Sequence, residues 1–184
     1  MKRNIIGSVI IIAFIAFLGL FPLLGHLWGD KIHVIRTEIS QIEPWFLNEE
    51  KSKVVLIYFG YVGCTSICIP TMNQFAPMYQ EILRKGEKVP LYFVNLNPNQ
   101  PKEWVEPFAK SFHPDFKGIW ASWDQTYKLE HDFNLAMSGE EEISHSSNLY
   151  LMVREEGGYV LRRIYTTHPY PADLILDDIV RFGR

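Results

Sequence analysis

Residues 54–68 read VVLIYFGYVGCTSIC, and this stretch decides the fold. Its first six residues form an unbroken β-branched and aromatic run, which is typical of a strand buried on both faces. A glycine-containing turn ends the run, and the chain's two cysteines, Cys64 and Cys68, follow directly. From Pro70 the apolar residues recur at helical spacing, so the cysteines lie in a loop between a buried strand and a helix.

The rest of the chain alternates between strand and helix patterns. Pro77 interrupts the helix that starts near residue 70, which predicts a kink or a division there. Ser122 is a good helix cap, because its hydroxyl can accept a hydrogen bond from a first-turn N–H group. The predicted strands are 54–59, 91–94, 119–121, 148–153 and 159–164, with the last two joined as a hairpin; further helices are predicted at 102–112, 123–132 and 171–182. This order predicts an α/β fold, a mixed sheet with helices on both faces.

The amino terminus carries a separate signal. It begins with basic residues, and the uncharged apolar run 5–24 is long enough to cross a hydrocarbon core of roughly 30 Å. A cleaved signal peptide is the alternative, but the run lacks the small-residue pattern of a cleavage site. We therefore expect residues 1–29 to form a cytoplasmic tip and a transmembrane helix. Residues 30–52 are expected to be a linker into the fold with at most one short strand, and 53–184 the folded domain.

Composition and charge narrow the functional classes. A chain of 184 residues suits one folded domain. The formal net charge is −3, and acidic and basic residues are mixed along the chain. The sequence has no Lys/Arg stripe of the kind that binds nucleic acid, so DNA and RNA partners are not expected.

The position of the two cysteines predicts redox chemistry or metal binding. Thiolates at a helix N-terminus are stabilised by backbone N–H groups and by the helix dipole. A purely structural disulfide is disfavoured, because closing so small a loop stabilises a fold little. Residues i and i+4 of a helix have Cβ atoms roughly 5–6 Å apart, against roughly 3.5–4.5 Å in a relaxed disulfide. A metal between two sulfurs tolerates the wider gap, and a disulfide stays reachable if Cys64 lies in the loop.

The chemistry of two thiolates narrows the choice of metal. Soft sulfur ligands suit Cu(I), Zn(II) or an iron–sulfur cluster. Two sulfurs are too few for a cluster or for a closed structural zinc site. Cu(I), which accepts low coordination numbers, fits best, and imidazole is the natural third ligand.

Three segments between about residues 50 and 182 share the pattern of a known family: YFGYVGC at 58–64, FHPDF at 112–116 and SHSSNLYL at 144–151. In this order, and with Cys68 and Pro70 after the first segment, they resemble the Sco/SenC family of copper-handling proteins. The resemblance implies a thioredoxin-like fold on a single membrane anchor. It also implies a copper site made by Cys64, Cys68 and His145.

The chain departs from the family pattern around these ligands. Ile69 stands between the second cysteine and Pro70, and residues 65–67 include no acidic side chain. Ser144 replaces the aspartate that usually precedes the histidine, and Asn97 replaces an aspartate at the end of a strand. These changes remove negative charge near the site and leave the three ligands unchanged.

Other residues have simpler interpretations. His168 is the best candidate for an auxiliary ligand, and His113 is expected at a helix end, where a cationic ring suits the dipole. Met72 and Met78 have helical spacing beside aromatic residues, which indicates core packing rather than thioether ligation. The acidic run 140–142 is expected to be a solvated loop.

The resemblance implies a copper chaperone, which is a binding module rather than an enzyme. It would deliver copper, as Cu(I) foremost and Cu(II) as a second possibility, to the dinuclear centre in subunit II of cytochrome c oxidase or to another copper client. The alternative is a thiol–disulfide oxidoreductase that uses Cys64 and Cys68 to reduce client cysteines. The expected location is a bacterial cytoplasmic membrane, with the C-terminal domain on the periplasmic side.

Overall fold

A computed structural model of the chain describes residues 14, 16–17, 34–39, 42–135, 137–138 and 144–184. The chain forms two units, 1–33 and 34–184, and the described residues of the first unit are helical. Within the described ranges no helix has the length and hydrophobicity needed to cross a bilayer. The predicted transmembrane segment lies almost wholly outside those ranges.

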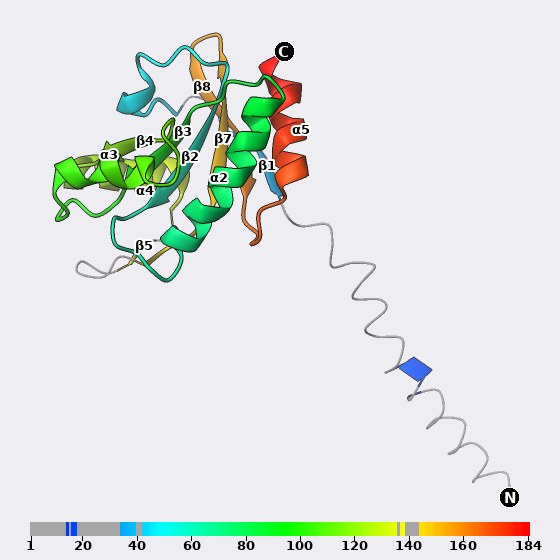
Figure 1. Cartoon of the computed structure of the whole chain (residues 1–184), viewed down its shortest axis with the longest axis horizontal. Helices are drawn as coiled ribbons and strands as arrows, with labels where there is room; N and C mark the ends of the chain where they lie inside the picture. Colours follow the sequence, from blue (N-terminus) through cyan, green and yellow to red (C-terminus); the bar gives the residue numbers. More distant parts are fainter. Residues whose placement is uncertain (1–13, 15, 18–33, 40–41, 136, 139–143) are drawn as a thin grey trace, which may run out of the picture. The chain divides into compact units, whose positions relative to one another are not determined.

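A six-stranded sheet in the order β1-β8-β7-β2-β3-β4 forms the centre of the second unit (Figure 1). The strand predicted from residue 54 is β2 (Val54–Gly60), and all seven of its residues are buried. It pairs in parallel with β3 (Leu91–Asn95), which pairs in parallel with the edge strand β4 (Lys117–Trp120). The parallel half therefore has the buried, continuous apolar sequence expected of it.

The other half of the sheet is antiparallel. The predicted hairpin is present as β7 (Leu149–Glu155) and β8 (Gly158–Tyr165), with β7 paired to β2. Strand β1 (Val34–Ile39) pairs with β8 at the far edge, within the range expected to be a linker with one short strand. A short helix, η1 (Trp45–Leu47), precedes β2.

Helices cover both faces of the sheet. One core cluster contains alternate β2 residues such as Leu56 and Tyr58, together with buried residues of α2 (Cys68–Arg84), α3 (Lys102–Lys110) and α5 (Ala172–Gly183). The intervening β2 residues, Val55, Ile57 and Phe59, join a second cluster with α4 (Trp123–Phe133) and η1. The predicted mixed sheet with helices on both faces is confirmed.

Local predictions held at most helix ends, and one of the two alternatives expected at Pro77, division of the helix, is excluded. Ser122 caps α4 through a reciprocal capping box with Gln125, as its sequence predicts. Pro77, however, lies inside α2 without dividing it. Its ring is exposed, while the neighbouring residues Phe75 and Met78 are buried in the core. A two-stranded hairpin of β5 (Met137–Ser138) and β6 (Ser144–His145) was not predicted, because such short strands leave no periodic pattern.

Candidate dithiol and metal site

The cysteines lie where β2 passes into α2. Gly63 takes a positive φ of 88° in the turn, a conformation that glycine adopts without strain. Cys64 follows in the loop, and Cys68 is the first residue of α2. Gly60 leaves room for the second sulfur, because a Cβ atom added there would lie 2.9 Å from Sγ of Cys68.

The two cysteines are thiols, not a disulfide, and both are buried. Their exposed fractions are 3% for Cys64 and 0% for Cys68. The backbone N–H of Cys68 donates a hydrogen bond to Sγ of Cys64 over 3.5 Å. The loop therefore brings two soft donor atoms together in a site closed to bulk water.

The surroundings shift the pKa values of the two thiols in opposite directions. Burial raises the pKa of Cys64, but hydrogen bonds from the N–H and thiol of Cys68 and from Ser66 outweigh it and hold the pKa at about 7. Burial raises the pKa of Cys68 to about 12, although a hydrogen bond with the backbone of Tyr61 opposes this. At neutral pH Cys64 is about half thiolate and Cys68 is a thiol.

A buried asparagine fixes the loop in front of the cysteines. The side-chain carbonyl of Asn95, at the end of β3, accepts a hydrogen bond of 3.0 Å from the N–H of Val62. Its amide donates to the carbonyl of Asn97 over 2.7 Å. Asn97, the residue that replaces a family aspartate, accepts a hydrogen bond from the N–H of Asn99. The sequence pointed to Asn97 and missed Asn95, whose only signal is a polar residue directly after a buried apolar run.

The third predicted ligand is placed by its backbone only. His145 pairs with Met137 in the β5–β6 hairpin, and its side chain is not among those that the structure describes. Two residues later, the hydroxyl of Ser147 lies 3.0 Å from that of Tyr58, and the Tyr58 hydroxyl also hydrogen-bonds the Cys68 thiol. Since two residues span at most roughly 7 Å, the segment of His145 lies at the same end of the sheet as the cysteines (Figure 1).

The donor set that the structure describes is incomplete for a three-ligand site. Among the described side chains, no three from His, Cys, Asp and Glu gather in a metal-binding group. Cys64 and Cys68 supply two soft donors, and their fit to Cu(I) rests on sulfur chemistry and on the absence of any charged residue from 54 to 80. His145 remains a predicted third ligand.

The other candidates have different surroundings. Nε2 of His168 lies 2.9 Å from the carbonyl of Ser147, so this exposed ring contacts the His145 segment. Met72 and Met78 are buried core residues, as predicted. His113 lies just after the end of α3, as expected, and its ring is buried, with Nδ1 accepting a hydrogen bond from the N–H of Asp115. Residues 140–142 lie outside the description.

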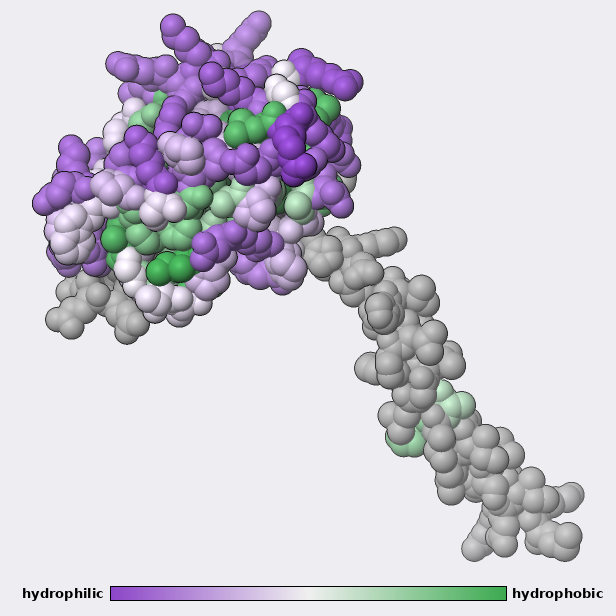
Figure 2. All heavy atoms as spheres, in the orientation of Figure 1, coloured by the Kyte–Doolittle hydropathy of each residue, from purple (hydrophilic) through white to green (hydrophobic). Residues whose placement is uncertain are grey.

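The surface around Cys64 is uncharged and partly apolar. In Figure 2 apolar side chains gather over the β2–α2 loop and the first turns of α2. Ile67, between the cysteines, is 37% exposed, while Val62 and Ile69 are half-buried. A protein partner that reaches Cys64 would therefore meet an uncharged surface.

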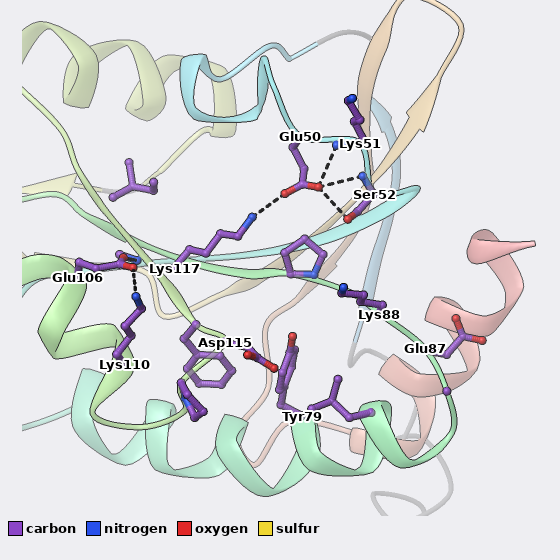
Figure 3. A pocket seen from close by; sticks show the side chains of 17 residues that line it. Glu50, Lys51, Ser52, Tyr79, Glu87, Lys88, Glu106, Lys110, Asp115 and Lys117 are labelled. Atoms are coloured by element: carbon purple, nitrogen blue, oxygen red, sulfur yellow. Dashed lines mark hydrogen bonds and ion pairs between the residues drawn. The ribbon is translucent and has the colours of Figure 1, made fainter.

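A separate groove lies away from the cysteines. This groove of about 1250 Å³ runs along the start of β4 and the adjacent loops, and none of its lining residues comes from the cysteine loop. Figure 3 shows its charged side chains, with Lys117 paired to Glu50 over 2.8 Å and Lys110 to Glu106 over 2.9 Å. Paired charges of both signs give this groove no clear ligand preference.

A dithiol in the loop between a buried strand and a helix, on a mixed sheet covered on both faces, defines a thioredoxin-fold dithiol protein. The SCO1/SenC family model matches residues 47–182, and the chain belongs to this family. The resemblance seen in the sequence is thereby confirmed.

Individual relatives agree with this assignment. An SCO2-like protein of Rickettsia felis is 26% identical over 190 residues, covering 90% of this chain and 92% of that protein. The crystal structure of a SCO1/SenC family lipoprotein from Bacillus anthracis superposes with a TM-score of 0.65 at 19% identity, covering 75% of this chain and 86% of the other. A copper-bound Arabidopsis thaliana ScoI gives a TM-score of 0.61 at 24% identity, with coverages of 71% and 83%. These likenesses establish the thioredoxin-like fold.

Proposed function

We propose that the protein is a membrane-anchored copper chaperone that holds Cu(I) between Cys64, Cys68 and His145 and delivers it to cytochrome c oxidase. The observation that carries this proposal is the pair of buried thiols, one of which ionises near neutral pH. Family membership supports it, as does the copper bound by the ScoI protein of Arabidopsis.

Copper loading follows from the acidities of the thiols. Cys64 is already half ionised at neutral pH, so it is the first sulfur to bind an incoming Cu(I). Cys68 must lose its proton as it binds, which makes loading pH-dependent. An imidazole from His145 would complete a three-coordinate site, and a client thiolate could then replace these ligands one at a time.

Two further features support the proposed location and client. The uncharged run 5–24 would anchor the chain in a bacterial cytoplasmic membrane, with the dithiol domain on the periplasmic side. BsSco, a solved relative, is described as a member of the Sco family of cytochrome c oxidase assembly proteins. The client proposed here is the dinuclear copper centre in subunit II of that oxidase.

Thiol–disulfide exchange is the second candidate, favoured by the difference between the two pKa values. The Cys64 thiolate would attack a client disulfide, form a mixed disulfide and release one client thiolate. Cys68, once deprotonated, would attack the sulfur of Cys64 and release the second client thiol. The client gains two electrons, and the protein is left with a Cys64–Cys68 disulfide that a separate thiol reductant must reduce.

One titration separates these functions. The full chain in detergent, fully reduced and free of oxygen, is titrated with Cu(I) against a competing chelator, with His145→Ala beside wild type. We expect one tightly bound Cu(I) per chain and a loss of affinity of about tenfold or more in His145→Ala. His131→Ala, which removes an exposed histidine of α4, is the matched control. Equal affinities for wild type and His145→Ala would favour the reductase.

A further inference from the structure

Ser147 is held by three side chains from other parts of the chain. It lies between β6 and β7 and is only 8% exposed. Its hydroxyl is 3.0 Å from the hydroxyl of Tyr58. Its carbonyl accepts a hydrogen bond from the hydroxyl of Tyr170 and another from Nε2 of His168, each of 2.9 Å. Both lone pairs of the Ser147 carbonyl oxygen and its hydroxyl group therefore have hydrogen-bond partners.

Two of these side chains, Tyr58 and Tyr170, pack against α2, the helix that begins with Cys68. The ring of Tyr58 packs edge-on against Phe75 of α2, with centroids 5.3 Å apart, and Tyr170 lies 4.9 Å from the same ring. His168 packs against Tyr170 at 4.5 Å. A rigid path therefore leads from the cysteine-bearing helix to Ser147, two residues beyond His145.

The hairpin that carries His145 needs support of this kind. Strands β5 and β6 are joined by two residue pairs, Met137 with His145 and Ser138 with Ser144. A two-stranded ribbon of this length is not stable by itself in water. A metal ligand on such a ribbon binds tightly only if its distance to the other ligands is fixed in advance.

We propose that Tyr58, His168 and Tyr170 are positioning residues that hold Ser147, and with it the strand of His145, at a set distance from Cys68. This inference rests on the proposed Cys64–Cys68–His145 copper site. It assigns His168 a supporting role beside the site, where the sequence suggested an auxiliary ligand.

Tyr170→Phe is the sharpest test, because the hydrogen bond of the Tyr170 hydroxyl goes to the Ser147 carbonyl and the ring contact with Phe75 is retained. In the full reduced chain, titrated with Cu(I) against a chelator, we expect affinity to fall about 10- to 100-fold, the usual effect of losing a group that orients a ligand. In a His145→Ala background the same substitution should leave the affinity unchanged. A merely destabilising change would lower affinity in both backgrounds.

The matched control is Tyr159→Phe. It removes another hydroxyl hydrogen bond, of 2.7 Å to the carbonyl of Ser52, away from the cysteine loop. We expect this variant to bind Cu(I) as wild type does.

Amide hydrogen exchange of residues 144–148 in the reduced, copper-free chain gives a second readout. Tyr170→Phe should speed exchange in this segment, and Tyr159→Phe should not. Unchanged exchange in Tyr170→Phe would overturn the inference, as would an equal loss of copper affinity with and without His145. If wild type and His145→Ala bind copper alike, the proposed copper site fails instead, and the exchange data alone decide whether the three residues hold the segment.

Discussion

The rate at which Cys64 is alkylated as the pH changes tests the electrostatics of the cysteine loop. Only the thiolate reacts with iodoacetamide, so the rate follows the ionised fraction. Burial opposes ionisation of Cys64, but hydrogen bonds from Cys68 and Ser66 lower its pKa from 9.0 to about 7. The thiolate should therefore be nearly fully formed by pH 8.5.

The structure sets the size of the effect. With a pKa of about 7, the rate should rise only about twofold from pH 7 to pH 8.5. The rate for an unperturbed thiol, with a pKa of 9.0, would rise about 24-fold over the same interval. Limited access to Cys64 lowers every rate by the same factor, so the ratio of the two rates is the quantity to compare.

The assay is mass spectrometry of the Cys64 peptide after timed alkylation of the reduced chain. Cys68, with its pKa raised to about 12 by burial, should remain unmodified across the range and serve as an internal reference. A rise of Cys64 reactivity well above tenfold between pH 7 and 8.5 would refute the assignment of hydrogen bonds to its sulfur. Preferential labelling of Cys68 would refute the order of the two acidities.

Gly60→Ala should raise the pKa of Cys64, because the new Cβ atom, 2.9 Å from Sγ of Cys68, would displace the thiol that stabilises the Cys64 thiolate. The same alkylation series measures this pKa. Gly118→Ala should destabilise the domain by about 2–4 kcal/mol in urea denaturation, since the new Cβ would clash with the Val105 carbonyl oxygen and would push α3 away from β4. Glu50→Gln should lower the melting temperature at pH 7: burial raises the pKa of Glu50, but hydrogen bonds, the one from Lys117 foremost, hold it far below 4.5. That stabilisation is complete above pH 4.5 and is lost as the pH falls, so wild type and variant should converge in acid.

The parts of the site whose residues are consecutive in the chain could be predicted from the sequence. The buried run of β2, the loop and the start of α2 lie within fifteen consecutive residues, and their local patterns do not depend on distant partners. The pairing of Tyr58 with Ser147 could not be found this way, because 89 positions separate the two residues. The role of Asn95 could not be predicted for the same reason, since its partner Val62 lies 33 positions earlier, in the loop between β2 and α2.

Pro77 shows a different limit. The rule that proline breaks helices counts the lost hydrogen bond and a clash with the preceding turn. In α2 the neighbouring residues Phe75, Met78 and Tyr79 are buried against the sheet, and this packing holds the helix together across an exposed proline. Tertiary burial therefore outweighs the tendency of the proline to divide the helix.

The contacts at Ser147 also favour one of the two proposed functions. A thiol–disulfide reductase needs only the two cysteines, and their different acidities suffice for attack and resolution. It would gain nothing from fixing a histidine strand beside them. Yet two buried tyrosine hydroxyls and a histidine N–H converge on the residue two positions after His145, and one of those hydroxyls also meets the Cys68 thiol. Such an arrangement would serve the proposed three-ligand copper site, so these contacts favour the copper chaperone over the reductase as the proposed function.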